Sequence, residues 1–452
     1  MAHPLHLKIV YRTRWMTMKT RLLVWLALAP SFALAQNSAP LKLTLHDAVA
    51  LALRQNPQVI LANLNVAQST EDSYLARSGL MPQVGGRISE EVQRLNVDAL
   101  FGQPFPGIPQ HIGPFWVEQE GIQFSAPLDL TLWRRYQAAQ TGISAARAQE
   151  ITAREESVLL VVSQYLGCQR SAADVEAAQA RETLAQALYD QAADLQKNGV
   201  GTGIDTLRAN VELQNEKQRV IVSRTELETG LFALGRLLSV DPQRKIELAD
   251  QVQFFETPDV SADRTLEHAY ATRPELRQIA AQTAQAQLAL KAAAEERLPK
   301  LTLSGGWSEQ GLTPTSVIPV YQYQASLDVP LFTGGRIGAE RAKVEISLRQ
   351  LKQQEQAARD SIALEVKTAI AQLAAARNEV KVANLGVDLA RQEVDQARDR
   401  FQAGVANNIE VVNAQNELAR ANDNQISALY SYNQARADLA HSEGQMEAIY
   451  AK

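Results

Sequence analysis

Two long stretches of this sequence contain no proline, and they restrict the fold more than any other feature. They cover 133–198 and 336–403, and each ends at a glycine, Gly199 or Gly404. At a rise of 1.5 Å per residue, a helix of about 66 residues is roughly 100 Å long. Small apolar residues recur along one side of each stretch, so the helices should pack closely side by side. Such lengths are typical of coiled-coil-like or tubular assemblies and not of ordinary globular domains.

The chain repeats itself at a constant offset of 205 residues. NGVGTGIDTLRANVELQNE (198–216) and AGVANNIEVVNAQNELARA (403–421) share the pattern G-V-x3-I-[DE]-x3-A-x2-E-L. In each copy the glycine suits a left-handed cap at the end of the long helix. We predict tight turns at 199–204 and 404–409, each followed by a return helix. These return helices should cover 204–239 and 409–443.

The segments before the long helices also correspond. Each copy opens with two helix-like runs that meet at a proline, over 43–82 and 265–299. The sequence then alternates between apolar and polar residues at a period of two, which predicts two strands and a loop. These hairpins should lie at about 82–130 and about 299–332. In the first, the loop 96–114 contains so many prolines that it should not be helical.

The ends of the copies define the domain organisation. From Met18 the chain has a basic start, an apolar core and Ala33-Leu34-Ala35, which predicts a secretory signal peptide. A short membrane anchor is the alternative, but the apolar run is too short to span a bilayer comfortably. We expect an over-long start plus signal peptide, a first repeat, a linker within an irregular stretch near 240–263, and a second repeat. In that order, their limits are 1–35, 36–250, 251–263 and 264–452.

This order of elements resembles the TolC family of outer-membrane efflux proteins over about residues 42–445. The resemblance implies a mainly α fold with transmembrane β, in a homotrimer that extends from the outer membrane into the periplasm. Four strands per chain would close a β-barrel in outer-membrane lipid, and the long coiled-coil-like helices would continue it as an α-barrel. Independently of the family, an open four-stranded sheet would leave unpaired backbone groups in lipid, so the chains must associate to close it.

Aromatic residues of the predicted strands are candidates for the girdle that marks a membrane interface. Packing inside a soluble β-domain is the alternative for the same side chains. The candidates are Phe115, Trp116, Trp307, Tyr321 and Tyr323.

The resemblance further implies an exit duct of a tripartite efflux system that passively conducts small toxic molecules. A periplasmic adaptor and an inner-membrane pump, proton-driven or of the ABC type, would deliver them. The same fold serves as the exit duct of type I protein secretion, and the sequence does not separate the two. A soluble periplasmic coiled-coil scaffold or adaptor is an alternative of another class, which two amphipathic hairpins disfavour.

In this family the helix–helix turns form the periplasmic mouth of the tunnel. Asp205 and Glu410 lie six residues after the turn glycines, where the family has acids at the constriction. Asn413 lies where a second aspartate often occurs. Threefold symmetry would make each acid a ring that selects cations. An acid in the first turn of a helix also stabilises the helix dipole, and this effect alone accounts for both residues.

The tips of the turns are candidates for adaptor docking, because small apolar residues at an exposed tip suit a partner's helical hairpin. These residues are Gly199, Val200, Gly404 and Val405. A helix cap with its hydrophobic contact is the simpler interpretation of the same four residues.

The second turn departs from the best-known form of the family, in which a Tyr and an Arg lock onto an acid of the first turn. Phe401 and Ala406 occupy the corresponding positions and offer neither a hydroxyl nor a charge. The tunnel must therefore be held closed in another way. Arg208 and Arg400 are candidates for locking the gate.

No catalytic motif accompanies this architecture. The six histidines are scattered, and there is no metal-binding or nucleophile signature. Gly334-Gly335 lacks the Lys-Ser/Thr of a phosphate loop, and Cys168, the only cysteine, has no intrachain partner for a disulfide. We therefore expect no enzymatic activity, cofactor or metal. The mild net charge of −5 gives no indication of nucleic-acid binding.

Overall fold

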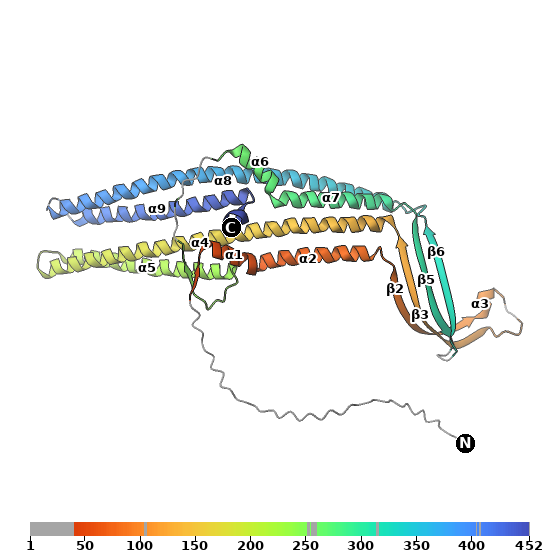
Figure 1. Cartoon of the computed structure of the whole chain (residues 1–452). Helices are drawn as coiled ribbons and strands as arrows, with labels where there is room; N and C mark the ends of the chain where they lie inside the picture. Colours follow the sequence, from red (N-terminus) through yellow and green to blue (C-terminus); the bar gives the residue numbers. More distant parts are fainter. Residues whose placement is uncertain are drawn as a thin grey trace, which may run out of the picture. The chain divides into compact units, whose positions relative to one another are not determined.

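A computed structural model describes residues 40–103, 106–250, 254, 260–312, 316–403, 405 and 408–451. The expected signal peptide and much of the expected linker lie outside these residues. The first copy comprises α1 (Leu45–Gln55), α2 (Pro57–Ser78), β2 (Gln83–Asn96), β3 (His111–Leu128), α4 (Leu130–Lys197) and α5 (Gly203–Leu237). The second comprises α6 (Ala262–Thr272), α7 (Pro274–Glu295), β5 (Lys300–Gly311), β6 (Ile318–Asp328), α8 (Arg336–Gln402) and α9 (Asn408–Ser442). Figure 1 shows the two sets of helices side by side.

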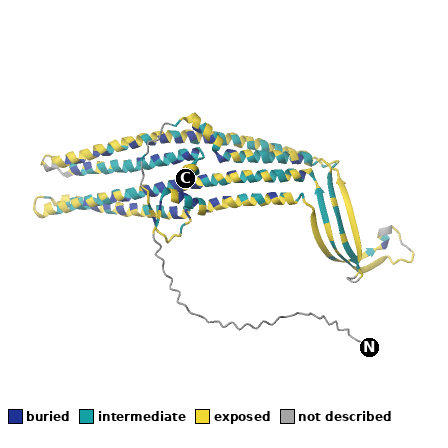
Figure 2. Cartoon of the chain, in the orientation of Figure 1, coloured by how far each residue is buried: buried dark blue, intermediate teal, exposed yellow. Residues whose placement is uncertain are grey.

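The two long helices are continuous, as the sequence predicts. Helix α4 has 68 residues and α8 has 67. The Asp129 side chain caps the start of α4 by accepting a 2.8 Å hydrogen bond from the Thr131 N–H. Helix α4 packs against α2 and then α5, and α8 packs against α7 and α9. Figure 2 shows buried positions in short patches between exposed ones along these helices, as expected of a narrow apolar stripe.

The largest core cluster lies where the first copy meets the C-terminal end of the second. Strand β1 (Leu41–Leu43) pairs in parallel with β4 (Ile246–Leu248). Beside them the fully buried Tyr165 hydroxyl shares its one proton between two acceptors, Leu43 O at 2.9 Å and Asp250 Oδ2 at 3.2 Å. The expectation of irregular structure near 240–263 is therefore wrong for β4. A three-residue strand whose partner is about 205 residues away leaves no periodic signal.

A short helix at the end of the chain is fixed to this core. It is α10 (Met446–Tyr450), and the buried Glu155 carboxylate accepts hydrogen bonds from its first two N–H groups, Met446 N at 2.7 Å and Glu447 N at 3.2 Å. Arg154 forms an ion pair with the Glu447 side chain. This pairing, mainly through its hydrogen bond, holds the pKa of Glu447 below its usual value.

The four long strands form one antiparallel sheet in the order β2-β3-β5-β6. Both predicted hairpins are thus present, and β2 and β6 are the edges of the sheet. The expectation that 96–114 is not helical is wrong for α3 (Val97–Phe101), which Asn96 caps through a 3.2 Å hydrogen bond from Ala99 N. All prolines of the loop follow this helix in the sequence, so they do not restrict it. Strand β3 also begins inside the predicted loop.

His441, near the end of α9, should make the stability of this region depend on pH. Burial, and next the nearby Arg273 guanidinium, lower the pKa of His441 below 6.5. Its Nδ1 has no hydrogen-bond partner among the described residues. The unfolded chain therefore takes up the proton first, and stability is lost as the pH falls below about 6.5. In heat denaturation, the melting temperature should fall less between about pH 7.5 and about pH 5.5 for His441→Gln than for wild type. The exposed His46→Gln is the control, and equal losses in all three proteins would contradict the expectation.

Candidate functional site

The first turn closes α4 tightly and exposes an apolar residue. Gly199 has a left-handed φ of 74°, which allows Val200 N to donate a 3.0 Å hydrogen bond back to Leu195 O. The Val200 side chain is 78% exposed. The sequence therefore forms the predicted glycine cap and leaves an uncovered valine at the tip.

Asp205 lies in the first turn of α5 and is exposed. The Thr202 hydroxyl donates a hydrogen bond to its Oδ2. Arg208, one turn further along α5, brings its nearest guanidinium nitrogen to 4.0 Å from Oδ1. Both contacts are local and solvent-exposed, so they contribute little to stability.

The second turn differs by a close ion pair between its two helices. Arg400 Nε, at the end of α8, lies 2.8 Å from Glu410 Oε1, in the first turn of α9. Val405 is 71% exposed, and its N–H donates a 3.0 Å hydrogen bond to Arg400 O. Arg400 thus holds the two sides of the turn together, whereas the ion pair that Arg208 makes among the described residues stays within its own helix.

The structure describes only some of the remaining residues expected at this turn. Asn413 is exposed and lies three residues after Glu410, on the same side of α9. Phe401 is the penultimate residue of α8, and its side chain lies outside the described part of the structure, as do Gly404 and Ala406. The acid and amide of α9 therefore form one polar strip that begins at the turn.

A polar cluster that sequence reasoning missed connects the two copies. Arg181 of α4 binds the Asp423 carboxylate of α9 through two nitrogens, at 2.8 and 3.0 Å. Glu216 of α5, with a side chain only 8% exposed, lies 3.9 Å from Arg181 Nε and 3.4 Å from Arg219 Nε. The offset of 205 residues aligns Glu216 with Ala421, so the repeat pattern gives no signal for this cluster.

The sheet has two chemically different faces. Because side chains alternate along a strand, the paired Trp307 and Tyr321 share a face with Ile122, while the paired Gly306 and Gln322 share the other face with Gln123. Residues on the first face, which we call the apolar face, include Val84 and Ile88, at 70% and 82% exposed. Four glutamates, Glu90, Glu118, Glu120 and Glu309, also lie on this face, nearer the loops than Trp307. The second, polar face carries mainly glutamine, serine and glycine.

The girdle candidates do not all lie on the apolar face. Trp116, Trp307, Tyr321 and Tyr323 do, whereas Phe115 pairs with Gln93 on the polar face. The prediction missed Phe124, whose ring centroid lies 6.2 Å from that of Tyr323. These two rings lie over Gly305, where a Cβ would approach Tyr323 Cδ1 to 2.5 Å.

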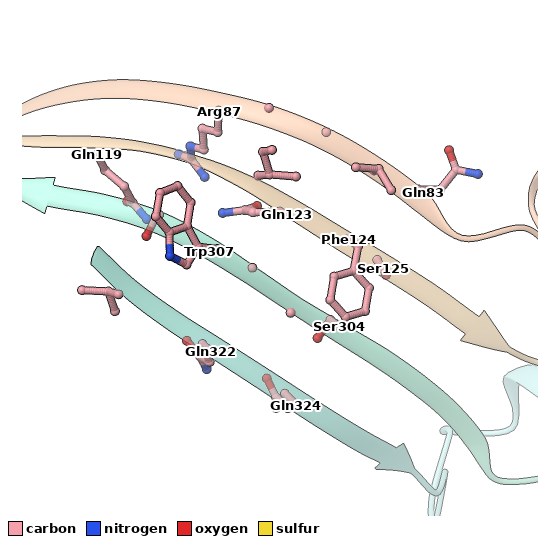
Figure 3. A pocket seen from close by; sticks show the side chains of 18 of the residues that line it. Gln83, Arg87, Gln119, Gln123, Phe124, Ser125, Ser304, Trp307, Gln322 and Gln324 are labelled. Atoms are coloured by element: carbon pink, nitrogen blue, oxygen red, sulfur yellow. The ribbon is translucent and has the colours of Figure 1, made fainter. Parts of the chain in front are cut away.

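A hollow of about 590 Å³ runs along the sheet. Figure 3 shows that its lining comes from all four strands, with Arg87 on β2 extending toward β3. Among its polar lining residues are Gln119, Gln123, Gln322 and Gln324. This surface can donate and accept hydrogen bonds but has little charge.

Neither a membrane-spanning helix nor a metal site occurs in the described residues. No helix there combines the length and apolar composition needed to cross a membrane. No three His, Cys, Asp or Glu side chains in the same residues come together as metal ligands.

The open sheet with one apolar face, joined to paired helices of about 100 Å, defines a class of channel-forming export proteins. The family model for outer membrane efflux proteins matches residues 48–239 and 265–445, so this chain belongs to that family. Its members are outer-membrane exit ducts that reach into the periplasm. They form trimers and work with periplasmic adaptors and inner-membrane pumps in efflux or type I secretion.

Two curated relatives of this chain, both from Pseudomonas aeruginosa, match most of its length. The pyoverdine export outer membrane protein OpmQ is 23% identical over 414 residues, covering 87% of this chain and 83% of OpmQ. The alkaline protease secretion protein AprF is 24% identical over 453 residues, covering 96% of this chain and 90% of AprF.

Solved structures show the same fold. The Campylobacter jejuni CmeC outer membrane channel has a TM-score of 0.79 at 17% identity, covering 89% of this chain and 85% of CmeC. CusC has a TM-score of 0.76 at 18% identity, covering 91% of this chain and 95% of CusC. The expected fold class is thereby confirmed.

Proposed function

We propose that this chain is the outer-membrane duct of a tripartite efflux system and passively conducts small toxic molecules. The sheet carries the proposal. Within the described part of the chain, its edge strands β2 and β6 lack neighbours on one side. In lipid each unpaired backbone group costs several kcal/mol, and pairing β6 of one copy with β2 of the next around a threefold axis removes that cost. The apolar side chains of the apolar face then contact outer-membrane lipid, with the glutamates of this face toward the outer interface, and the polar face lines the duct.

The strand lengths support this arrangement. The four strands have 14, 18, 12 and 11 residues, and about 9–11 residues of a tilted strand cross a bilayer. Trp116 lies toward the loop end of the apolar face, and Trp307, Tyr321 and Tyr323 lie nearer the helices. We place these aromatics at the two membrane interfaces, without Phe115. A duct needs no catalytic group, and the net charge of −5 favours no nucleic-acid partner.

At the helical end, the proposal assigns Asp205, Glu410 and Asn413 to the pore constriction. Three copies of each acid around the axis would attract cations. The Arg400–Glu410 pair at 2.8 Å would restrain the second turn in place of the family's Tyr and Arg. The exposed Val200 and Val405, next to Gly199 and Gly404, would receive the helical hairpin of the adaptor.

Single-channel recordings of the purified trimer in a planar bilayer test the duct and the acid ring. Wild type should give cation-selective openings. In Asp205→Asn/Glu410→Gln, the cation-to-anion permeability ratio should fall toward about 1, because the fixed negative charge is gone.

Two matched variants separate the roles of charge and restraint. Arg400→Gln should keep the selectivity and raise the conductance, because Glu410 stays charged but the bond to Arg400 across the turn is lost. Glu417→Gln, an exposed acid further along α9, should behave as wild type. Unchanged selectivity in the double variant would reduce the two acids to helix caps. A folded trimer that conducts neither as wild type nor as Arg400→Gln would refute the duct.

A duct for type I protein secretion is the second candidate function, which the match to AprF favours. Deletion of the gene separates the two. Sensitivity to small toxic compounds with normal protein secretion supports efflux, and loss of a secreted protein without such sensitivity supports secretion.

A further inference from the structure

The polar face of the sheet has a regular arrangement around one arginine. Arg87 on β2 pairs with Gly121 on β3, which pairs with Ser308 on β5 and then Val320 on β6. No neighbour in this row has a long polar side chain. The guanidinium therefore has open space above the sheet, and Figure 3 shows it extending from β2 over β3.

Glutamines surround this row on both sides. Toward the helices, Gln123 and Gln322 alternate with Gly85 and Gly306 in the neighbouring row. Toward the loops, Gln119 pairs with Gln310. Because small residues separate them, the amide groups can reach a solute held at Arg87, and each amide offers both donors and an acceptor.

Among the described residues, no carboxylate forms an ion pair with Arg87. The other charged residues on this face of the strands lie elsewhere: Glu91 lies four residues nearer the loops, and Lys300 and Asp328 pair with each other at the helix end. Lys300 also lies 3.3 Å from Asp129. Arg87 is thus the one cation in the hollow that the described chain leaves without an opposite charge.

We propose that Arg87 and the adjacent glutamines form a binding station for small oxyanions, such as carboxylates, in the outer part of the duct. An arginine fork donates two parallel hydrogen bonds to a carboxylate or a similar oxyanion, and the glutamines bind its hydroxyl or amide groups. The proposal rests on the proposed function, because the polar face must line the duct. In the trimer three Arg87 side chains surround the path.

Along the duct, a solute would pass the acids of the turns, Asp205 and Glu410, first and this station afterwards. A solute that carries both a cationic and an anionic group finds an opposite charge at each end. The substrates favoured by this arrangement are polar and zwitterionic or acidic, with many hydrogen-bonding groups.

Titration calorimetry with citrate on the purified full-length trimer tests the station without requiring conduction. Arg87→Gln should bind citrate about tenfold more weakly than wild type, and Arg87→Lys should lie between the two. The control is Arg94→Gln, an exposed arginine on the same strand but outside the hollow, which should bind as wild type. Equal citrate affinity in all four proteins, or no binding by wild type, would overturn the proposal.

Bilayer recordings separate this proposal from that of the duct. Citrate added on the loop side should block the wild-type current at lower concentration than the current of Arg87→Gln. A conducting channel with identical block in both proteins refutes the station and leaves the duct intact. Arg87-dependent citrate binding by a trimer that never conducts refutes the duct and retains the anion site.

Discussion

Replacing Gly121 with valine is expected to prevent the sheet from forming and to abolish folded trimers in the outer membrane. A Cβ at this position would lie 2.5 Å from Ser308 Cβ, 2.6 Å from Trp307 O and 2.7 Å from Ser308 Cα. Two of these atoms belong to the backbone of β5, so no side-chain rotation relieves the clash, and β3 must move away from β5. Overpacking of this kind costs about 3 kcal/mol or more.

The amount of heat-resistant trimer in outer-membrane fractions measures this effect. Gly85→Val is the matched control, because Gly85 lies on the same face in β2 and nothing approaches its Cβ position within 4 Å. It should assemble almost normally, since valine favours strands. Normal assembly of Gly121→Val would show that β3 and β5 are further apart at this position than the 2.5 Å contact with Ser308 Cβ requires.

Periodic features of the fold could be predicted from the sequence. Proline-free stretches gave α4 and α8 within a few residues, and Gly199 gave the first turn, because helix length and capping are local properties. Alternation gave the hairpins for the same reason. Strand β4 could not be predicted, because its ladder partner, β1, is distant in the sequence.

In the candidate site, too, local features could be predicted, whereas contacts that depend on pairing between elements could not. The 2.8 Å Arg400–Glu410 pair joins residues ten apart; the resemblance selected Glu410, and nearness to the turn in the sequence selected Arg400. Phe115 was assigned to the girdle by residue type alone, whereas its face depends on the register of β3 with β2. Arg181, Glu216 and Asp423 come from three helices, and each of them alone resembles a solvated charge on a helix.

Removal of the Arg181 side-chain charge by Arg181→Met is expected to lower the free energy of unfolding by about 3 kcal/mol. Asp423 loses both its hydrogen bonds, and the buried Glu216 carboxylate keeps only Arg219, at 3.4 Å. A buried charge without its partner retains the full cost of its lost hydration. Denaturant titration of the purified full-length protein measures the change.

Arg420→Met is the matched control. Arg420 is 75% exposed and pairs with Glu417 in its own helix, so its loss should cost less than about 0.5 kcal/mol. An equal effect of the two substitutions would show that the Arg181 cluster is no stronger than a surface pair.

A rescue experiment identifies the buried charge as the cause. Adding Glu216→Gln to Arg181→Met removes the buried carboxylate that has lost Arg181, and most of the lost stability should return. A small cavity of about 50 Å³ beside Arg181 and Glu216 leaves room for a water molecule that could bind the new amide.

Because the cluster joins α4 and α5 of one copy to α9 of the other, the single variant should also loosen the two helix pairs from each other. The double variant should restore stability without restoring the bond to Asp423, so any remaining rise in channel conductance would measure what that bond contributes to holding the helix pairs together.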